Sequence, residues 1–316
     1  MKQPLLAIRL GCSAALLLVL SACGLSSAEP TLPSSAPAPT AAPQPPQSAP
    51  TTQPPAELTE STAAVQVVLD YYQAITQQHY DQAYGLWAEG GAASGQTRSA
   101  FAQGYANTAG LSVLLDRATL SADAVTVPIT IVSVLNQSEQ TQQPQRFSGT
   151  YTLRQEAGGW RIASANIAEG QASAEPPAST ADALRVLQAY EQAIDEGNYP
   201  RAYTYWESNG TASQQSYTVF VEGFASTDRV TLATGQARTN AAAGSVYTEV
   251  PVVVLGQQRD GSREAFCGSY RLRRANLPPF DTFGWRINSA SILKLENAEL
   301  DSDTRERLLA GQCAAR

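Results

Sequence analysis

Apolar residues recur at helical spacing in two separate segments of the chain. The first segment carries Val65, Val68, Tyr71, Ala74 and Ile75, and the second carries Leu184, Leu187, Tyr190, Ala193 and Ile194. Spacings of three and four residues place such side chains on one face of an α-helix. We therefore predict an amphipathic helix in each segment. A shorter helix follows each one, beginning near Tyr80 and Tyr199, and Pro200 suits a first helical turn because its missing N–H would have no partner there.

Further along, the period of the apolar residues drops towards two. This alternation covers residues 125–131, 147–153 and 160–167, and polar, turn-forming stretches separate these segments. An alternation of this kind is typical of antiparallel strands with one buried face. Helices grouped first and strands grouped afterwards predict an α+β domain.

The whole pattern occurs twice. Tyr71 corresponds to Tyr190 and Trp87 to Trp206 at a constant offset, and residues 159–167 (GWRIASANI) return as residues 284–292 (GWRINSASI). A length of 316 residues, 43% of them hydrophobic, is enough for two domains with separate cores. We therefore divide the chain into a signal peptide (1–22), a linker (23–57), a first domain (58–170), a short linker (171–180) and a second domain with a C-terminal helix (181–316).

Each copy resembles the nuclear transport factor 2-like (NTF2-like) superfamily, in which helices fill the concave side of a curved antiparallel sheet. The residues that carry the resemblance are Tyr71, Ala74 and Ile75; Tyr80, Ala83, Tyr84 and Trp87; Phe101 and Gly104; and Gly159, Trp160, Arg161 and Ile162. The likeness is strongest to the non-catalytic domains of bacterial lipoproteins and of some penicillin-binding proteins. It implies two tandem NTF2-like domains.

The N-terminus has the features of a lipoprotein signal peptide. Lys2 and Arg9 lie in a polar start, and the apolar run 14–20 is too short to span a bilayer. The run leads into Leu20, Ser21, Ala22 and Cys23, which resemble a bacterial lipobox. The resemblance implies cleavage before Cys23 and acylation of that residue, and two or three acyl chains anchor a protein stably to a membrane surface. The alternative is an ordinary secretory signal with an incidental cysteine.

Between the lipobox and the first domain, residues 25–57 are rich in Pro, Ser, Ala, Thr and Gln. Such a segment cannot bury enough apolar surface to fold, so we expect a disordered, partly polyproline linker. At about 3.1 Å per residue it could reach on the order of 100 Å from the membrane. The net charge is -7, and loss of the two signal-peptide cations makes it more negative, which excludes an electrostatic surface for nucleic acid.

Two of the four cysteines remain once the signal and the lipid are accounted for. Cys12 leaves with the signal and Cys23 carries the lipid, so Cys267 and Cys313 are left. Outside the cytoplasm we expect them to form a disulfide, which would attach the C-terminal tail to the second domain. Two free thiols are the alternative.

No group of residues predicts an acid–base pair, a metal site or a cofactor site. His79, the single histidine, lies in a polar turn, and the carboxylates considered, Asp70, Asp116 and Asp123, face neither a histidine nor a second carboxylate in the pattern. Phosphate-binding loops, Cys/His clusters and G-x-S-x-G motifs are lacking. We expect a protein without a cofactor and without enzymatic activity.

Two further sets of residues leave alternatives open. Six aromatic residues could line a ligand cavity, although we expect most of them to be core: Tyr71, Tyr84, Trp87, Tyr190, Tyr203 and Trp206. Four arginines alternate with apolar residues and are interpreted as solvent-facing strand positions or as partners of nearby carboxylates, with anion binding as the remaining alternative: Arg154, Arg161, Arg273 and Arg286.

The sequence therefore favours a membrane-anchored extracytoplasmic lipoprotein that acts as a binding or scaffolding module. Its partner would be an envelope protein, a wall polymer or a small apolar ligand. The resemblance also leaves room for an isomerase or dehydratase type of enzyme acting in one domain, and for an accessory factor in cell-wall assembly. We expect the two copies to pair through the open faces of their sheets, so that the chain is its own pseudo-dimer.

Overall fold

The computed structural model describes residues 56–135, 144–170, 179–242, 244–276 and 283–313. The predicted signal peptide, the predicted lipid-bearing residue Cys23 and nearly all of the first linker lie outside these residues, as does most of the second linker. None of the described helices is both long enough and apolar enough to cross a membrane.

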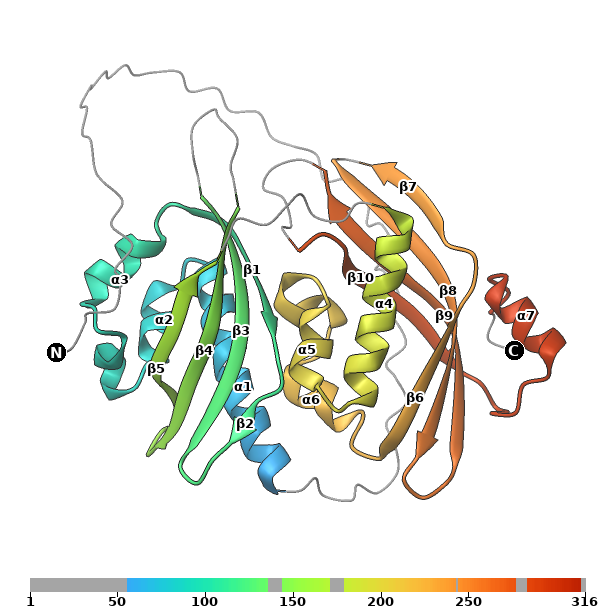
Figure 1. The fold of residues 1–316 in the computed structure, drawn as a ribbon, viewed down its shortest axis with the longest axis horizontal. Coiled ribbons are helices and arrows are strands. Elements are labelled where there is room, and N and C mark those ends of the chain that lie inside the picture. The colour runs from blue at the N-terminus through green and yellow to red at the C-terminus, as the bar shows by residue number, and fades with distance from the viewer. Residues whose placement is uncertain (1–55, 136–143, 171–178, 243, 277–282, 314–316) are drawn as a thin grey trace, which may run out of the picture. The chain divides into compact units, whose positions relative to one another are not determined.

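The first copy consists of helices followed by an antiparallel sheet (Figure 1). Its helical part contains α1 (Ala56–Thr76), α2 (Tyr80–Gly85), the 3-10 helix η1 (Glu89–Ser94) and α3 (Arg98–Tyr105). Its strands are β1 (Thr108–Leu115), β2 (Thr119–Leu120), β3 (Ala124–Leu135), β4 (Gln145–Glu156) and β5 (Gly159–Glu169). The strand order is β1-β3-β4-β5, and β2 pairs with β3.

The second copy repeats this order. Its helical part contains α4 (Thr180–Asp195), α5 (Tyr199–Thr204), η2 (Ser208–Ser213) and α6 (Tyr217–Glu222). Its strands are β6 (Thr227–Thr234), β7 (Arg238–Ala242), β8 (Ser245–Gln258), β9 (Arg263–Ala275) and β10 (Arg286–Lys294), in the order β10-β9-β8-β6, with β7 paired to β8. The helix α7 (Ser302–Leu309) follows. The predicted fold class is confirmed as α+β, with two tandem domains that each consist of N-terminal helices packed on a curved antiparallel sheet.

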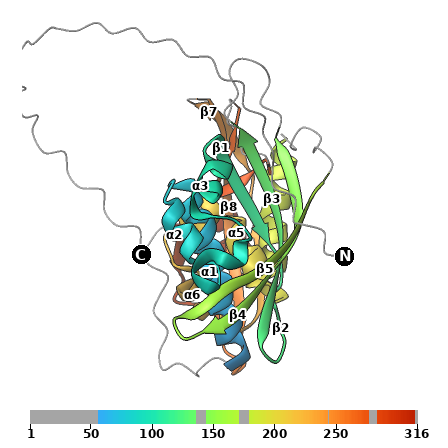
Figure 2. The same ribbon diagram turned by 90° about the vertical axis from the view of Figure 1, so that its left-hand side faces the viewer.

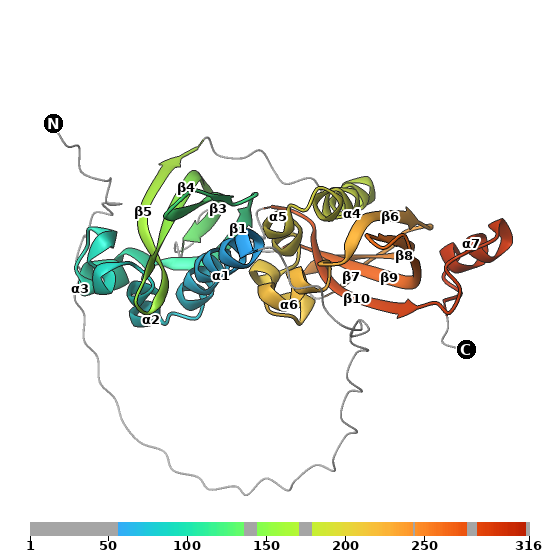
Figure 3. The same ribbon diagram turned by 90° about the horizontal axis from the view of Figure 1, so that it is seen from below.

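In each copy the helices pack into the concave side of the sheet. Figures 2 and 3 show the sheet of the first copy curving around α1 and α2. The predicted apolar stripe of α1, from Val65 to Ile75, is buried, and so are Leu187, Tyr190, Ala193 and Ile194 on α4. Burying one such side chain stabilises the fold by about 1.5–3 kcal/mol, which is why the stripe orients the helix.

The repeated nine residues of the closing strand have a structural reason. The N–H of Ile162 donates to the carbonyl of Leu86 at 2.9 Å, and the carbonyl of Ile162 accepts from Ala88 at 2.9 Å. Ile287 makes the corresponding two bonds to Tyr205 and Glu207 at 3.0 and 2.9 Å. The strand therefore holds the end of the short helix in both copies. Burial of Ile162 and Ile287 at 0% exposure fixes which residue takes this position.

A glycine is required where the chain passes a tyrosine ring. A Cβ on Gly91 would lie 2.0 Å from a ring atom of Tyr84, and one on Gly210 would lie 2.0 Å from a ring atom of Tyr203. Both glycines also have positive φ, +104° and +102°. The tyrosine hydroxyls donate to the carbonyls of Gln96 and Gln215, at equivalent positions of the two copies.

The C-terminal helix covers the outer face of the second sheet. Val252 points into the main core, so its neighbour Val253 points to the opposite face, where it clusters with Cys267 and Leu308 of α7. Cys267 and Cys313, the two cysteines paired in the sequence prediction, form a disulfide with a Cα–Cα distance of 5.7 Å. The tail is thus attached to β9.

The sequence pattern missed β1 and β6. Along β1 the letters TAGLSVLL show no regular alternation, and β6 carries the charged pair Asp228 and Arg229. Both are edge strands of their sheets. An edge strand pairs with a neighbouring strand along one edge only, and other parts of the protein meet its other edge. The pattern of apolar and polar residues along the strand therefore depends on those other parts.

Candidate functional site

The interior of the first copy, enclosed between its helices and its sheet, contains four tyrosines whose hydroxyls pair with one another. Tyr71 and Tyr105 approach to 2.8 Å between their hydroxyl oxygens, and Tyr72 and Tyr151 do the same at 2.8 Å. Burial, reinforced by the neighbouring phenols, raises the pKa of Tyr71, Tyr72 and Tyr151 well above the ordinary value. All of them are therefore neutral phenols at physiological pH, and each satisfies its polar atom within the cluster.

The interior of the second copy is more apolar. Tyr190, Trp206 and Tyr270 form a triangle of edge-on rings with centroids 5.9 to 6.1 Å apart. Burial raises the pKa of Tyr270 to about 12. Glu191 and Phe224 occupy the positions that Tyr72 and Tyr105 hold in the first copy, so the hydroxyl network is not repeated.

The aromatic residues considered as cavity-lining are part of this packing. Tyr71, Trp87, Tyr190, Tyr203 and Trp206 are between 1% and 7% exposed. Tyr84 is partly exposed and stacks edge-on against Phe101. Rings that contact one another at these distances fill the interior rather than frame an opening in it.

Among the described residues, neither the histidine nor the carboxylates considered from the sequence form a hydrogen bond with the aromatic rings of either interior. Asp182, which caps α4 together with Ser179, is the one buried carboxylate within the described ranges. Asp70 is half-buried and accepts a hydrogen bond from Gln66 at 2.8 Å, and burial raises its pKa. His79 and Asp123 are exposed. Over the part of the chain that the structure describes, no group of acidic, histidine and cysteine side chains could hold a metal ion.

The four arginines differ in their surroundings. Arg154 is exposed, and Arg161 donates to the carbonyl of Trp160 at 2.8 Å. Arg273 forms an ion pair with Glu207 at 2.8 Å, so the interpretation as a carboxylate partner is correct for it. A solvent-facing position is wrong for Arg286.

Arg286 is only 3% exposed. It donates to the carbonyl of Thr204 at 2.9 Å and lies over the ring of Phe283 at 4.4 Å. The alternation of the strand concealed this, because a local pattern does not reveal that the Thr204 carbonyl of α5, 82 residues away in the sequence, lies beside the Arg286 guanidinium. Arg286 therefore supports the helix that contacts the first copy.

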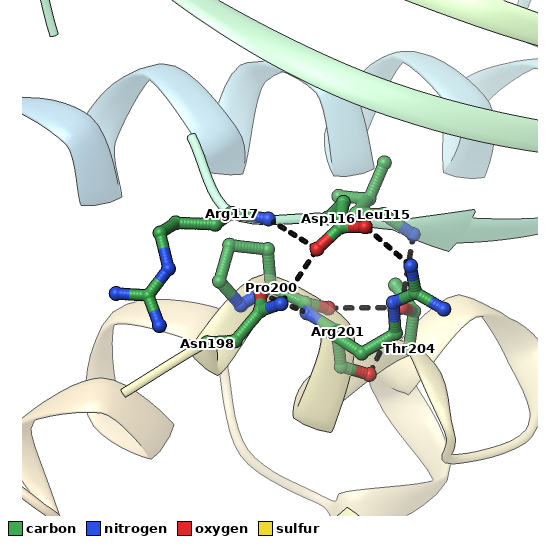
Figure 4. Close-up of polar contacts among 7 residues, drawn as sticks. All are labelled: Leu115, Asp116, Arg117, Asn198, Pro200, Arg201 and Thr204. Atoms are coloured by element: carbon green, nitrogen blue, oxygen red, sulfur yellow. Dashed lines mark hydrogen bonds and ion pairs between the residues drawn. The ribbon is translucent and has the colours of Figure 1, made fainter. Parts of the chain in front are cut away.

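That contact joins the edge strand β1 to the second copy (Figure 4). The amide of Val113 donates to Oδ1 of Asn209 at 2.9 Å, and the amide of Leu115 donates to Oγ1 of Thr204 at 3.1 Å. Both amides belong to the side of β1 that does not pair with β3. Two side chains of the second copy thus satisfy edge amides that would otherwise be open to pairing with another strand.

Asp116, directly after β1, adds the charged part of the contact. Its carboxylate accepts from Nδ2 of Asn198 at 2.6 Å and forms an ion pair with Arg201 (Figure 4). Burial alone would raise the pKa of Asp116, but the hydrogen bonds from Asn198 and Arg201 hold it below its ordinary value. Arg117 donates in turn to the carbonyl of Glu196.

The second copy protects its own edge strand by different means. The amide of Val230 donates to Oδ1 of Asp195 at 3.1 Å, and the amide of Leu232 donates to Oε1 of Glu191 at 2.6 Å. Both carboxylates come from α4. The corresponding residues of α1 are Thr76 and Tyr72, which have no carboxylate to offer, so the first copy depends on the second.

These contacts differ from the predicted pairing of open sheet faces. The larger contacts between the copies, within the described ranges, involve β1 and α1 on one side and α5, α6 and η2 on the other. An edge of one copy therefore meets the helical side of the other, and the two surfaces are not equivalent. The physical reason is that the unsatisfied amides of β1 require polar side chains, which the helical side provides and a sheet face does not.

No family model matches the chain, and no curated protein matches it by sequence. The solved structures that are similar to part of it include the following three. A proposed dehydratase of the NTF2-like family from Streptomyces avermitilis is 16% identical, covers 37% of this chain and 99% of its own, and has a TM-score of 0.31. An NTF2-like superfamily protein from Salmonella enterica is 14% identical over 39% of this chain and 94% of its own, with a TM-score of 0.29.

The third is a proposed aromatic ring hydroxylase from Novosphingobium aromaticivorans. It is 14% identical, covers 41% of this chain and 99% of its own, and has a TM-score of 0.30. Identities at this level do not transfer an activity from one protein to another.

Proposed function

We propose that the protein is a non-enzymatic, membrane-anchored extracytoplasmic lipoprotein whose two NTF2-like copies act together as a binding or scaffolding module. The observation that carries this proposal is the filling of both interiors by aromatic rings. An NTF2-like enzyme would need a reactive group in that interior. Here the polar atoms of the first interior are phenol hydroxyls bonded to one another, and the second is lined by Tyr190, Trp206 and Tyr270.

Anchoring is supported by the lipobox-like residues that end at Cys23 and by the Pro-rich segment after it. A lipid at Cys23 would hold the protein at the membrane, and the linker would carry the two copies away from it. The partner would then be an envelope protein or a wall polymer, in keeping with a role as an accessory factor in cell-wall assembly, and it would meet the outer surfaces of the module.

The lipid is tested by expressing the full chain in a bacterium fed with labelled palmitate. We expect label on the wild type and on Cys12→Ala, and none on Cys23→Ala. Cys12→Ala is the matched control, because it removes a cysteine from the same signal region. Equal labelling of Cys23→Ala would show that anchoring is wrong.

The filled interior is tested with benzene, which enters an apolar cavity of sufficient size. We expect benzene to leave the unfolding temperature of the wild-type chain unchanged. Trp206→Ala should create a cavity and become more stable when benzene is added. Stabilisation of the wild type by benzene would reveal an open interior and would favour an enzyme or a carrier of small apolar ligands.

A further inference from the structure

A small pocket of about 220 Å³ lies in the second copy, close to its contact with the first. It is formed by the end of α4, the first residue of α5, the start of β6 and the turn after β8. Ligand sites for drug-sized molecules are about 300–1,000 Å³, so this pocket suits a ligand of few heavy atoms.

The pocket contains charged groups of both signs. Its charged lining residues are Asp195, Glu196, Asp228, Arg229 and Arg259. Among the described residues none of these side chains forms an ion pair, although opposite charges share one small space. Asp195 accepts from the Val230 amide and Glu196 accepts from Gln192. Arg229 and Arg259 are both exposed, so their guanidinium groups are accessible to an anionic group from solvent.

Tyr199 supplies a polar atom to the same pocket. It is only 8% exposed, and its ring is stacked on Phe224 with a centroid distance of 5.9 Å. In the described part of the chain its hydroxyl has no hydrogen-bond partner. Burial raises the pKa of Tyr199, and the positive charges of Arg259 and Arg117 only partly offset that rise.

The first copy shows that the fold does not need these charges. The positions of Asp195, Glu196, Asp228 and Arg229 are taken there by Thr76, Gln77, Ala109 and Gly110. Tyr80, which corresponds to Tyr199, donates its hydroxyl to the carbonyl of Tyr105 at 3.3 Å. The same scaffold therefore forms with neutral residues and a bonded tyrosine. Asp195 holds the edge amide of Val230, but Asp228, Arg229 and the unbonded Tyr199 hydroxyl are not needed to form this scaffold.

We propose that this pocket binds a small zwitterion that carries a free carboxylate and a free ammonium group, such as a free dipeptide. The ligand carboxylate would meet Arg229, Arg259 and the Tyr199 hydroxyl, and the ammonium would meet Glu196 and Asp228. Charge-assisted hydrogen bonds of this kind are about twice as strong as neutral ones. A ligand of one sign alone would be repelled by half of the lining. The inference rests on the proposed binding function and names the chemical class of its ligand.

The test is calorimetric titration of the full chain in detergent micelles with L-alanyl-L-alanine. For a ligand of this size we expect a Kd of about 1 mM. Acetylating its amine, or converting its carboxylate to a methylamide, should each weaken binding about tenfold or more. Arg259→Gln should weaken binding of the free dipeptide about tenfold and leave the methylamide unaffected. Arg238→Gln, an exposed arginine on β7, is the matched control and should change nothing.

Absence of binding at about 10 mM dipeptide, at which a 1 mM site would be nearly filled, would overturn the proposal. Equal affinity for the dipeptide and its two blocked forms would overturn it as well. The proposal would also be wrong if Arg259→Gln weakened binding of the methylamide as much as binding of the free dipeptide. These outcomes are distinct from failure of the proposed function, because labelling at Cys23 and stabilisation by benzene are measured without the dipeptide.

Discussion

Thr204→Val tests whether the second copy holds the edge of the first. Oγ1 of Thr204 accepts from the Leu115 amide at 3.1 Å and donates to the Pro200 carbonyl at 2.8 Å. Thr204 and Leu115 are both 0% exposed, so no water can replace the hydroxyl. Valine keeps the branched shape and removes only the polar atom.

The magnitude follows from the group that is left without a partner. A buried donor that loses its acceptor costs about 1–3 kcal/mol. The Pro200 carbonyl loses one of its bonds as well, but a carbonyl tolerates this better. We therefore expect Thr204→Val to lower the free energy of unfolding by about 2 kcal/mol. Thr211→Val removes an exposed hydroxyl of the same copy, bonded to the Ser208 carbonyl at 2.9 Å, and should cost less than about 0.5 kcal/mol.

Two measurements decide the outcome. Urea unfolding of the full chain compares the two variants with the wild type, and native-state hydrogen exchange follows the amides of β1. A loss of about 2 kcal/mol corresponds to roughly 30-fold faster exchange at Leu115. If Thr204→Val is as stable as Thr211→Val and the Leu115 amide exchanges at the wild-type rate, the second copy does not hold this edge.

Three further predictions concern the disulfide, the charged contact and a glycine. Cys313→Ser should lower the free energy of unfolding by up to about 4 kcal/mol, since the bond closes a separation of 46 residues to Cys267; unfolding with and without reductant checks this. The contact with Asn198 and Arg201 depresses the pKa of Asp116, so the stabilisation of the fold by this contact is present above the ordinary carboxyl pKa of 3.8 and is lost as the pH falls below it. The difference in unfolding free energy between the wild type and Asp116→Asn should therefore shrink between about pH 5 and pH 2.5. A difference that stays constant over this range would contradict the prediction. Gly210→Ala should cost on the order of 2–4 kcal/mol in thermal unfolding, because its Cβ would overlap the Tyr203 ring at positive φ, whereas an unchanged unfolding temperature would mean that the ring moves aside freely.

Much of each domain could be predicted from local pattern. The spacing from Val65 to Ile75 identified both the helix and its buried face, because a stripe at that spacing has only one way to be removed from water. The period of two in residues 125–131 predicted a strand with one buried face for the same reason. The sequence repeat corresponds to a repeated structure, since the hydroxyls of Tyr84 and Tyr203 make equivalent hydrogen bonds in the two copies.

Other features depended on contacts between distant elements. Arg286 has the alternating position of a surface residue, yet it is buried and donates to the Thr204 carbonyl of α5. Nothing in the sequence near Asp116 points to Asn198 or Arg201, which lie 82 and 85 residues further along. The pairing of charged residues at such distances depends on how whole domains dock.

The sequence by itself determined the two copies, their fold class, the apolar faces of their main helices and the pair of cysteines that could attach the C-terminal tail through a disulfide. These follow from hydrophobic period and composition, which act along a single element. Only the tertiary structure decided that an edge strand meets a helical side, and that Tyr199 lines a pocket with charged residues of both signs. Such arrangements are set by which donors and acceptors remain unsatisfied once the elements have packed, and that is a property of surfaces brought together rather than of any one segment.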